Sequence, residues 1–357
     1  MTKKVDFFLG ANSAHGFYGL YDQLKQNEQT YDFLILTGGP GVGKSTFMKQ
    51  VGKCAEEEDT DIEYIHCSGD PDSLDAVILP RHGVIIADGT DPHALKPKYP
   101  VAVDRYVDLG RFYQIDRVKE RRKEIIACTD GYKEEYKKAY ACLQVAQAVR
   151  KEMGQSLTPW FDVEKAWQRL KNIWLRERGK KQNGIGTEYK RFLGGCTAKG
   201  WVWYRQSITT LCKKIYELQD TYHLSAVLLQ KLGSMICEDG YDVILCMNPD
   251  SPKCIDHIFV PELEIGFVTT DEKFSLKSKA YRRIRIDQMI DRESYKDLRG
   301  ALRLKGHLAD ALEEEGVHYL HQAKEKHDEL ELIYKPFVNF DGVSELAKEE
   351  CTRIFGR

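Results

Sequence analysis

The interpretation of this chain starts from one stretch, Phe33-Leu34-Ile35-Leu36-Thr37-Gly38-Gly39-Pro40-Gly41-Val42-Gly43-Lys44-Ser45-Thr46. Residues 38–45 fit the pattern G-x-x-x-x-G-K-[ST], in which a glycine-rich loop between a strand and a helix encloses a phosphate chain. The apolar run before the loop predicts a buried strand, and apolar residues at helical spacing after it predict a helix over residues 43–58. This context favours a phosphate-binding loop, the Walker A motif, over a glycine-rich turn that matches by chance.

The residue types of residues 38–46, called the glycine loop below, suit phosphate binding. Glycines leave room for backbone N–H groups to approach an anion, and the amides at the start of the following helix face it. We expect Lys44 to stabilise charge on the β- and γ-phosphates of ATP, and the Ser45 hydroxyl to ligate Mg²⁺. The expected nucleotide-binding residues are Gly38, Gly39, Pro40, Gly41, Val42, Gly43, Lys44, Ser45 and Thr46.

Asp88 is the best candidate for a second ligand of Mg²⁺. It ends an apolar run, residues 84–87, that predicts another buried strand. Its carboxylate would emerge at the sheet edge where the glycine loop lies, and could hold the metal directly or through water. The alternative is an ordinary strand-end Asp that begins a turn with Gly89. We therefore expect Lys44 and Asp88 as catalytic residues, and Ser45 and Asp88 as metal ligands.

The residue that would activate an attacking water stays unassigned, because Gly89 and not a Glu follows Asp88. Four carboxylates are candidates, although each also suits a turn or a helix cap: Asp70, Asp72, Asp75 and Asp91. His66 ends a strand predicted over residues 62–67 and is better explained as a buried, hydrogen-bonded side chain than as a catalytic one. Candidates for a second positive charge at the phosphates are Arg81, Arg105, Arg111, Lys199 and Arg205.

The composition fits a globular protein whose balanced charge gives no general attraction to nucleic acid or to an acidic membrane. The 357 residues suffice for two ordinary domains, and the formal net charge of −2 provides no global field that attracts nucleic acid. No apolar run reaches the length of a membrane span, and the N-terminus lacks the apolar region of a signal peptide. The ten cysteines show no metal-binding spacing. We therefore expect a cytoplasmic protein with reduced thiols and with neither a membrane nor a nucleic-acid partner.

The second half of the chain repeats the first. A shift of 184 positions places Phe8-Leu9-Gly10 on Phe192-Leu193-Gly194, and a shift of 181 places Gly52 on Gly233. Each half combines alternating strands and helices with a charged helical arm, so we expect an α/β protein of two tandem P-loop NTPase-like domains with mainly parallel sheets. The expected boundaries are 1–183 for the first domain (core 1–114, arm 115–183) and 184–357 for the second (core 184–285, arm 286–357).

Two further local predictions concern helices of the first half. A helix is predicted over residues 18–26, after Asn12-Ser13. In the first arm Trp160, Trp167 and Trp174 recur every seven residues. This spacing favours a packing seam between two long helices over a platform for stacking nucleic-acid bases.

The second half lacks a glycine loop. The repeat aligns residues 43–46 with residues 224–227, and the sequence there contains no glycine and no lysine at the position of Lys44. Asp220 would bring a negative charge to the place of a bound phosphate. We therefore expect a degenerate second domain and a single nucleotide per chain, bound in the first half.

Several segments together carry a resemblance to a known family: residues 8–17, the glycine loop, the run from Glu63 to Asp75, the run from Val84 to Thr90, and Lys98-Tyr99-Pro100. The chain resembles a bacterial family of tandem-repeat P-loop ATPases whose cellular role is not established. The likeness spans nearly the whole chain, and its most specific segment is His66 to Ser73. It implies ATP binding with Mg²⁺ and hydrolysis, but no substrate. Family members carry a glycine-rich loop in both halves, and this chain departs from that pattern in its second half.

The function expected from these features is ATP binding with slow Mg²⁺-dependent hydrolysis, as a switch or regulator whose helical arms contact a protein partner. Two alternatives stay open. One is a kinase that passes the γ-phosphoryl group to a small molecule or nucleotide, with an acidic side chain accepting the hydroxyl proton. The other is a nucleotide-sensing scaffold that binds ATP without turnover.

Overall fold

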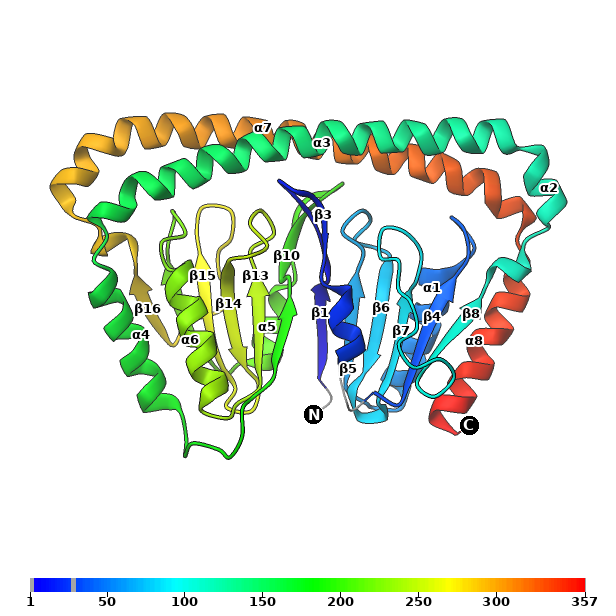
Figure 1. Ribbon diagram of the computed structural model, residues 1–357, viewed down its shortest axis with the longest axis horizontal. Helices are drawn as coiled ribbons and strands as arrows, with labels where there is room; N and C mark the ends of the chain where they lie inside the picture. Colours follow the sequence, from blue (N-terminus) through cyan, green and yellow to red (C-terminus); the bar gives the residue numbers. More distant parts are fainter. Residues whose placement is uncertain (1–2, 27–29, 357) are drawn as a thin grey trace.

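Figure 1 shows two α/β cores side by side beneath a pair of long helices that spans both. The computed structural model describes residues 3–26 and 30–356, and within them each core has a six-stranded sheet. The strands of the first sheet, in spatial order, are β1 (Lys4–Phe8), β5 (Ile62–His66), β6 (Leu74–Leu79), β7 (Val84–Asp88), β4 (Asp32–Thr37) and β8 (Asp104–Asp108). Those of the second, in the matching order, are β9 (Glu188–Arg191), β13 (Val243–Met247), β14 (Ile255–Val260), β15 (Ile265–Thr270), β12 (Lys214–Gln219) and β16 (Arg282–Arg285).

The two sheets share one strand order and one mixture of directions. In each sheet a central strand, β6 or β14, runs antiparallel to both neighbours, and the other neighbouring pairs are parallel. The predicted α/β class is confirmed, with mixed sheets that are mostly parallel, and the shared order supports the predicted repeat. β6 was not predicted from the sequence, although all six of its residues are buried.

The strand, loop and helix predicted around the glycine loop are present. β4 leads into the loop, and α1 (Lys44–Glu57) follows it. The face of α1 that carries Phe47, Met48 and Val51 is buried against the sheet, as its helical spacing predicts. In the second core β12 leads in the same way into α6 (Ala226–Glu238).

The helix predicted over residues 18–26 is wrong in its first part. β2 (Gly10–Ser13) and β3 (Gly16–Gly19) form an antiparallel hairpin, closed by Gly16 with a φ of 85°. Pairing with β2 engages the backbone of residues 18 and 19, so only Tyr21–Gln26 is helical, as a short 3-10 helix. The equivalent hairpin of the second half joins β10 (Gly194–Thr197) to β11 (Gly200–Trp203), and α5 (Arg205–Leu211) follows it.

The long helices above the cores are α3 (Arg122–Leu157) and α7 (Arg292–Tyr334), which run antiparallel along each other (Figure 1). Ion pairs join them, with Arg150 Nε 2.7 Å from Glu313 Oε1 and Lys326 Nζ 2.5 Å from Glu135 Oε1. The remaining arm helices are α2 (Ile115–Glu120), α4 (Val163–Glu177) and α8 (Phe340–Phe355).

The arms exchange their terminal helices between the cores. α4, at the end of the first arm, packs against α6 of the second core, whereas α8, at the end of the second arm, packs against α1 of the first core. An isolated β-bridge holds the chain before each exchanged helix against the other half: Phe161 pairs with Ile290 before α4, and Val338 pairs with Tyr113 before α8. Each core is therefore completed by a helix from the other half, and the sequence boundary near residue 183 is not a boundary of packing.

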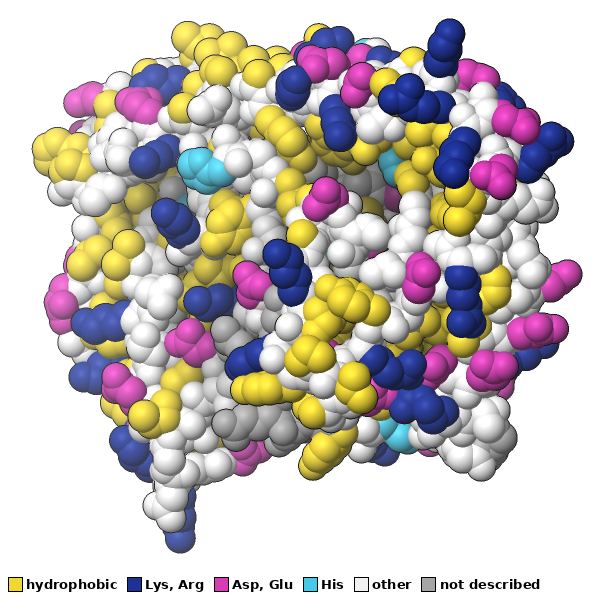
Figure 2. Space-filling view, turned by 45° about the vertical axis from the view of Figure 1, so that its right-hand side comes forward, with side chains coloured by type: hydrophobic (Ala, Val, Ile, Leu, Met, Phe, Trp, Pro, Cys, Tyr) yellow, Lys and Arg dark blue, Asp and Glu magenta, His cyan; other side chains and the backbone are white. Residues whose placement is uncertain are grey.

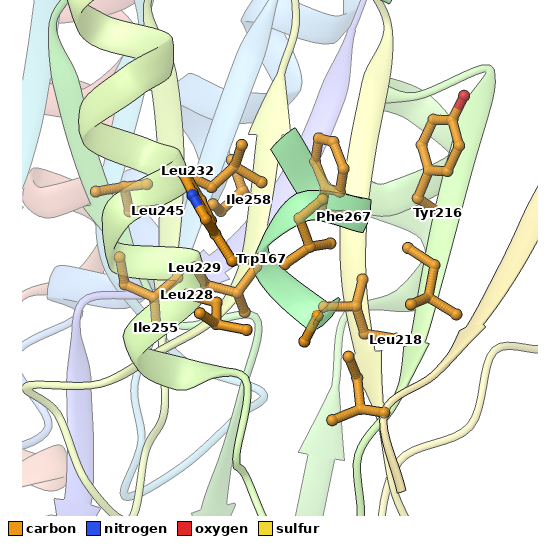
Figure 3. Close-up of a cluster of buried hydrophobic side chains, with 14 of the residues drawn as sticks. Trp167, Tyr216, Leu218, Leu228, Leu229, Leu232, Leu245, Ile255, Ile258 and Phe267 are labelled. Carbon is orange, nitrogen blue, oxygen red and sulfur yellow. The ribbon is translucent and has the colours of Figure 1, made fainter. Parts of the chain in front are cut away.

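The tryptophans of the first arm belong to this exchange. Trp174 is fully buried and Trp167 is 7% exposed, both in the core of the second half. Figure 3 shows Trp167 among the apolar side chains of this core. Trp174 Nε1 donates a hydrogen bond of 2.8 Å to Asp239 Oδ2. Trp160 lies outside α4 and is half-exposed. The structure thus confirms packing for two of the three, but their partner is a sheet-and-helix core and not a second long helix.

The cores also meet directly, through Phe8 and Phe192, which exchange two backbone hydrogen bonds of 2.9 Å. These residues are equivalent in the repeat, so the contact lies on an approximate twofold axis. Asn12 reinforces it, because its buried amide donates to the carbonyls of Ser68, at 3.1 Å, and Cys196, at 2.9 Å. The contact of like elements gives the two halves one fixed arrangement.

Candidate functional site

The glycine loop folds around the side chain of Lys44. Gly38, Gly41 and Gly43 have φ values of 138°, 69° and 98°, which favour glycine over any other residue. Lys44 Nζ donates to the carbonyls of Gly38, at 2.7 Å, and Gly39, at 3.3 Å. The loop thus holds a positive charge within a ring of backbone groups, at the N-terminus of α1. Among the described residues no side chain caps that terminus, so its first amides have no anionic side chain of their own.

Asp88 lies beside this loop, as predicted. β7 runs parallel to β4 as its direct neighbour, with Asp88 in register with Leu36, shortly before the loop. Asp88 Oδ2 is 3.6 Å from Lys44 Nζ, and the two side chains are 15% and 13% exposed. Asp88 Oδ1 accepts hydrogen bonds from Thr90 N, at 2.8 Å, and Thr90 Oγ1, at 2.6 Å. Asp88 therefore both begins a turn and faces the loop lysine, so the two readings of its sequence position are compatible.

Ser45 and Asp88 fit the kind of Mg²⁺ that arrives with a nucleotide. Ser45, at the start of α1, is linked to β6, because its Oγ accepts a hydrogen bond of 3.0 Å from Leu74 N. No group of three or more His, Cys, Asp or Glu suited to a metal occurs in the described part of the chain. Mg²⁺ commonly takes only one or two protein oxygens and keeps waters and phosphate oxygens as its other ligands. The donor set matches that pattern and not a metal cage made by protein alone.

The second arm and Tyr113 of the first core pack on the glycine loop, which the sequence did not predict. A Cβ atom on Gly41 would lie 3.2 Å from the carbonyl oxygen of Glu331 in α7. On the other side the Tyr113 hydroxyl donates a hydrogen bond of 2.7 Å to Pro40 O. Both neighbours lie far from the loop in sequence, and no local motif marks them.

Tyr113 also begins an open, largely apolar groove of about 360 Å³ beside the loop. Its other residues come from the junction of α2, α3 and α7: Ile115, Val118, Lys119, Arg122, Ile125, Ile126 and Tyr334. The Tyr113 and Tyr334 rings lie 5.5 Å apart between centroids.

Asp75 is not a free carboxylate near the loop. It is buried, accepts a hydrogen bond of 2.7 Å from the Tyr21 hydroxyl, and lies 3.4 Å from His93 Nε2. Burial alone would raise the pKa of Asp75, but the charge of His93 and the hydrogen bonds lower it. Burial alone would lower the pKa of His93, and the Asp75 carboxylate reverses that and raises it. The pair is thus held as a buried ion pair, with His93 Nδ1 left without a hydrogen-bond partner among the described residues.

Of the other acidic candidates, Asp70 and Asp72 lie close to lysines of the second half. Asp70 accepts from Ser73 Oγ at 2.9 Å and lies 3.5 Å from Lys324 Nζ of α7. Asp72 pairs with Lys199 of the other half, and the hydrogen bond from Lys199 lowers the pKa of Asp72. Asp91 precedes Pro92 in a cis peptide bond. None of these carboxylates presents a geometry that singles it out as the base.

His66 has the structural role predicted for it. Its Nδ1 lies 2.9 Å from the Pro71 carbonyl and its Nε2 lies 2.9 Å from Asp6 Oδ1. The imidazole is mostly buried, at 17% exposure. It therefore fixes the end of β5 against β1.

The candidate second cations lie away from the glycine loop or have other contacts. Arg105 pairs with Glu350 of α8 at 2.6 Å, and Arg205 donates to Ser275 O at 3.0 Å, within the second half. Lys199 contacts Asp72 and not the loop. The contacts of Lys199 and Arg205 therefore give no support to the prediction that one of the two lies near the first nucleotide site. A further cation that was not predicted, Lys324 of α7, reaches Asp70.

The corresponding loop of the second half, residues 220–225, is closed by its own side chains. Asp220 is fully buried and accepts hydrogen bonds from Leu224 N, at 2.9 Å, and Ser225 N, at 2.7 Å. His223 balances this charge from a φ of 53°, with its ring nitrogens 3.4 Å from Asp256 and 3.5 Å from Asp271. A carboxylate of the chain thus binds the two backbone amides that directly precede α6.

The length difference between the two loops is small. β4 and β12 correspond at a shift of 182 positions, since Leu36 pairs with Asp88 and Leu218 with Thr269. α1 and α6 correspond at 182 by their first residues and at 181 by their last. At most one of the three residues missing from the second half therefore falls in the loop. Side chains, more than shortening, close it.

Comparison with known proteins adds no assignment. Neither protein-family models, nor curated proteins, nor solved structures match this chain. The family resemblance seen in the sequence thus stays a prediction. Within residues 3–26 and 30–356 the structure has no helix with the length and apolar character needed to cross a membrane.

Proposed function

We propose that the glycine loop binds the phosphates of ATP together with Mg²⁺, and that the chain hydrolyses the nucleotide slowly as a switch or regulator. The observation that carries this proposal is the position of Lys44, whose ammonium lies inside a glycine-rich ring at an uncapped helix N-terminus, 3.6 Å from Asp88. Helix amides and an adjacent lysine together attract a phosphate chain, and the carbonyl contacts of Lys44 can be exchanged for phosphate oxygens.

Each residue has a defined part in this proposal. Lys44 would offset the negative charge of the β- and γ-phosphates, including the charge that develops on the leaving oxygen during hydrolysis. Ser45 and Asp88 would hold Mg²⁺, which supplies Lewis-acid stabilisation of the phosphate oxygens when bound. The base would lie along the groove that begins at Tyr113, where an aromatic ring offers a stacking surface.

Contact between the loop and the arms supports a switch in preference to simple hydrolysis. Glu331 of α7 packs on Gly41, and α8 packs along α1. Loop movement on nucleotide binding or release would therefore press on helices that continue across the second core. The affinity of the arms for a protein partner would therefore depend on whether nucleotide is bound.

The test measures binding and turnover on the same protein. ATP with Mg²⁺ is titrated calorimetrically against the parent chain, Lys44→Ala, and the control Lys53→Ala, which removes an exposed lysine from the same helix. We expect binding and phosphate release by the parent and the control, and loss of both in Lys44→Ala. Absence of Lys44-dependent phosphate release would overturn the hydrolase part, and γ-phosphate label on an added metabolite would favour the kinase alternative. Stable recovery of intact ATP after long incubation would favour the scaffold.

A further inference from the structure

A cavity lined by four cations lies in the second core, between α4 and β16. In Figure 1 these two elements lie at the other end of the molecule from β4 and α1, which flank the glycine loop. The cavity has a volume of about 370 Å³ and opens to the surface. Its walls come from α4, from β16 and from the short turn after β16, and its lining residues are Lys165, Arg169, Arg283, Arg285, Gln288 and Met289. We call it the basic pocket.

The charge of the basic pocket is largely uncompensated. Arg283 Nε donates a hydrogen bond of 2.7 Å to Glu217 Oε2. Within the described part of the chain, no carboxylate forms an ion pair with Lys165, Arg169 or Arg285. On the face shown in Figure 2, by contrast, basic and acidic side chains are intermixed. Like charges around one concave surface repel one another, and the same concentration of charge attracts an anion.

The repeat shows that the fold does not require cations at this place. Strand register makes Arg285 equivalent to Asp108, because they pair with the equivalent residues Gln219 and Thr37. The third residue after the cap of the exchanged helix is Lys165 in α4 and a glycine in α8.

In the first half an aromatic ring fills the equivalent corner. A Cβ atom on Gly342 would lie 2.6 Å from the Phe112 ring, so that ring packs directly on the helix backbone. In the second half the position of Phe112 is taken by Met289, at the wall of the basic pocket. The same junction is thus closed by packing in one half and open with a cationic lining in the other.

Protection of a sheet edge explains only part of this charge. β16 is an edge strand, and charged residues on edges prevent pairing with other chains. The equivalent edge strand of the first sheet, β8, serves the same need with mixed charges, Asp104, Arg105 and Asp108. Edge protection also gives no reason for Lys165 and Arg169, which come from a helix.

We infer that the basic pocket is a binding site for a small soluble molecule that carries two or more phosphate groups. Guanidinium groups bind phosphate oxygens in a bidentate manner, and Arg169 and Arg285 have no carboxylate partner to displace. Gln288 adds a neutral polar group, and Met289 offers an apolar wall for the organic part of the ligand. The ligand would join α4, from the first arm, to the second core, and so would stabilise the exchanged arrangement. This inference does not depend on nucleotide binding at the glycine loop.

The test uses the full chain with Lys44→Ala, so that binding at the glycine loop does not obscure the result. Pyrophosphate and tripolyphosphate are titrated calorimetrically without Mg²⁺ at low and moderate salt. The pocket variant adds Arg169→Gln and Arg285→Gln. The control adds Lys253→Gln and Arg303→Gln, two exposed cations outside the pocket, and so changes the net charge equally.

We expect both polyphosphates to bind, with an affinity that falls as salt rises. The dissociation constant should increase at least tenfold in the pocket variant and less than twofold in the control. Thermal unfolding without ligand should be alike in both variants, because both keep the stems of the replaced side chains. The inference would be overturned if the Lys44→Ala chain bound neither polyphosphate. It would also be overturned if the pocket variant and the control lost affinity equally.

Discussion

The glycine loop and residues 220–225 of the second half join equivalent strands to equivalent helices, yet they provide for the helix N-terminus in opposite ways. In the first half the amides at the start of α1 have no side-chain cap, and a lysine lies within the loop. In the second half Asp220 binds the amides of Leu224 and Ser225, which directly precede the first residue of α6, and His223 balances its charge. A helix N-terminus favours a negative charge from any source. The chain therefore supplies that charge itself in the second half, whereas in the first half no side chain of the described residues does so.

The largest effect that sharpens this comparison is expected from Lys44→Ala. Without the ammonium, phosphate charge in a partly dry loop is less compensated, so the affinity for ATP should fall by at least about 1–2 kcal/mol. Equilibrium titration of the parent chain should saturate at one nucleotide per chain, because Asp220 already binds the amides of the second half. The fold should survive, since the loop lies at the surface end of the sheet. Two sites per chain, or unchanged affinity in the variant, would break the comparison.

The second prediction removes the carboxylate that closes the second loop. Asp220→Ala leaves the buried amides of Leu224 and Ser225 without an acceptor, and we expect a loss of about 2 kcal/mol in the free energy of unfolding. Urea denaturation measures the change. Asp220→Asn retains one acceptor oxygen and should lose less.

The same variant tests what else prevents nucleotide binding there. Asp220→Ala should not gain a nucleotide site, because Tyr222, His223 and Leu224 still occupy positions where the first half has small residues. An unfolding curve that matches the parent, or new ATP binding, would show that Asp220 does not close this loop in the way described.

Local sequence signals predicted one side of this comparison well. The pattern of the glycine loop, the apolar strand before Asp88 and the α/β repeat each depend on neighbouring residues, and the structure has the strand, the helix and the class so predicted. The exchange of α4 and α8 could not be predicted in this way. An apolar helix face shows that a helix is buried, but two equivalent cores offer it two equivalent surfaces.

The rest of the site was missed for a related reason. Tyr113, His93 and Glu331 reach the loop or its neighbourhood only through tertiary folding, and none lies in a motif. In the second half the absence of glycine and lysine was visible in the sequence. The sequence did not show that Asp220 binds the amides of Leu224 and Ser225, because this contact depends on the geometry of the loop.

The third prediction concerns the contact between the glycine loop and the second arm. Gly41→Ala places a side chain on a residue with a φ of 69°, and its Cβ would lie 3.2 Å from the Glu331 carbonyl oxygen. We expect a loss of about 1–2 kcal/mol in the free energy of unfolding from backbone strain and displacement of α7. Gly300→Ala, in an open part of α7, is the control and should be neutral or slightly stabilising. Equal effects of the two variants would mean that α7 does not press on the loop.

The last and smallest effect is a pH dependence that belongs to the second loop. Burial alone would lower the pKa of His223, but the nearby carboxylate of Asp256, with Asp220 and Asp271, raises it to about 9 from 6.5. The folded chain therefore binds this proton more tightly than the unfolded chain does. The resulting stability is complete below pH 6.5 and is lost as the pH rises through 9.

The size of this effect is limited because the His223 side chain is 35% exposed, and solvent screens its ion pairs. Full linkage would give about 3 kcal/mol, and with screening we expect about 1 kcal/mol. The measurement is the difference in unfolding free energy between the parent and His223→Gln from pH 6 to pH 10, since subtraction removes the contribution of other histidines. Gln adopts the same positive φ at similar cost, so the difference reports the charge. It should shrink towards zero above pH 9, whereas parallel curves would show that the three carboxylates are held together without the imidazolium.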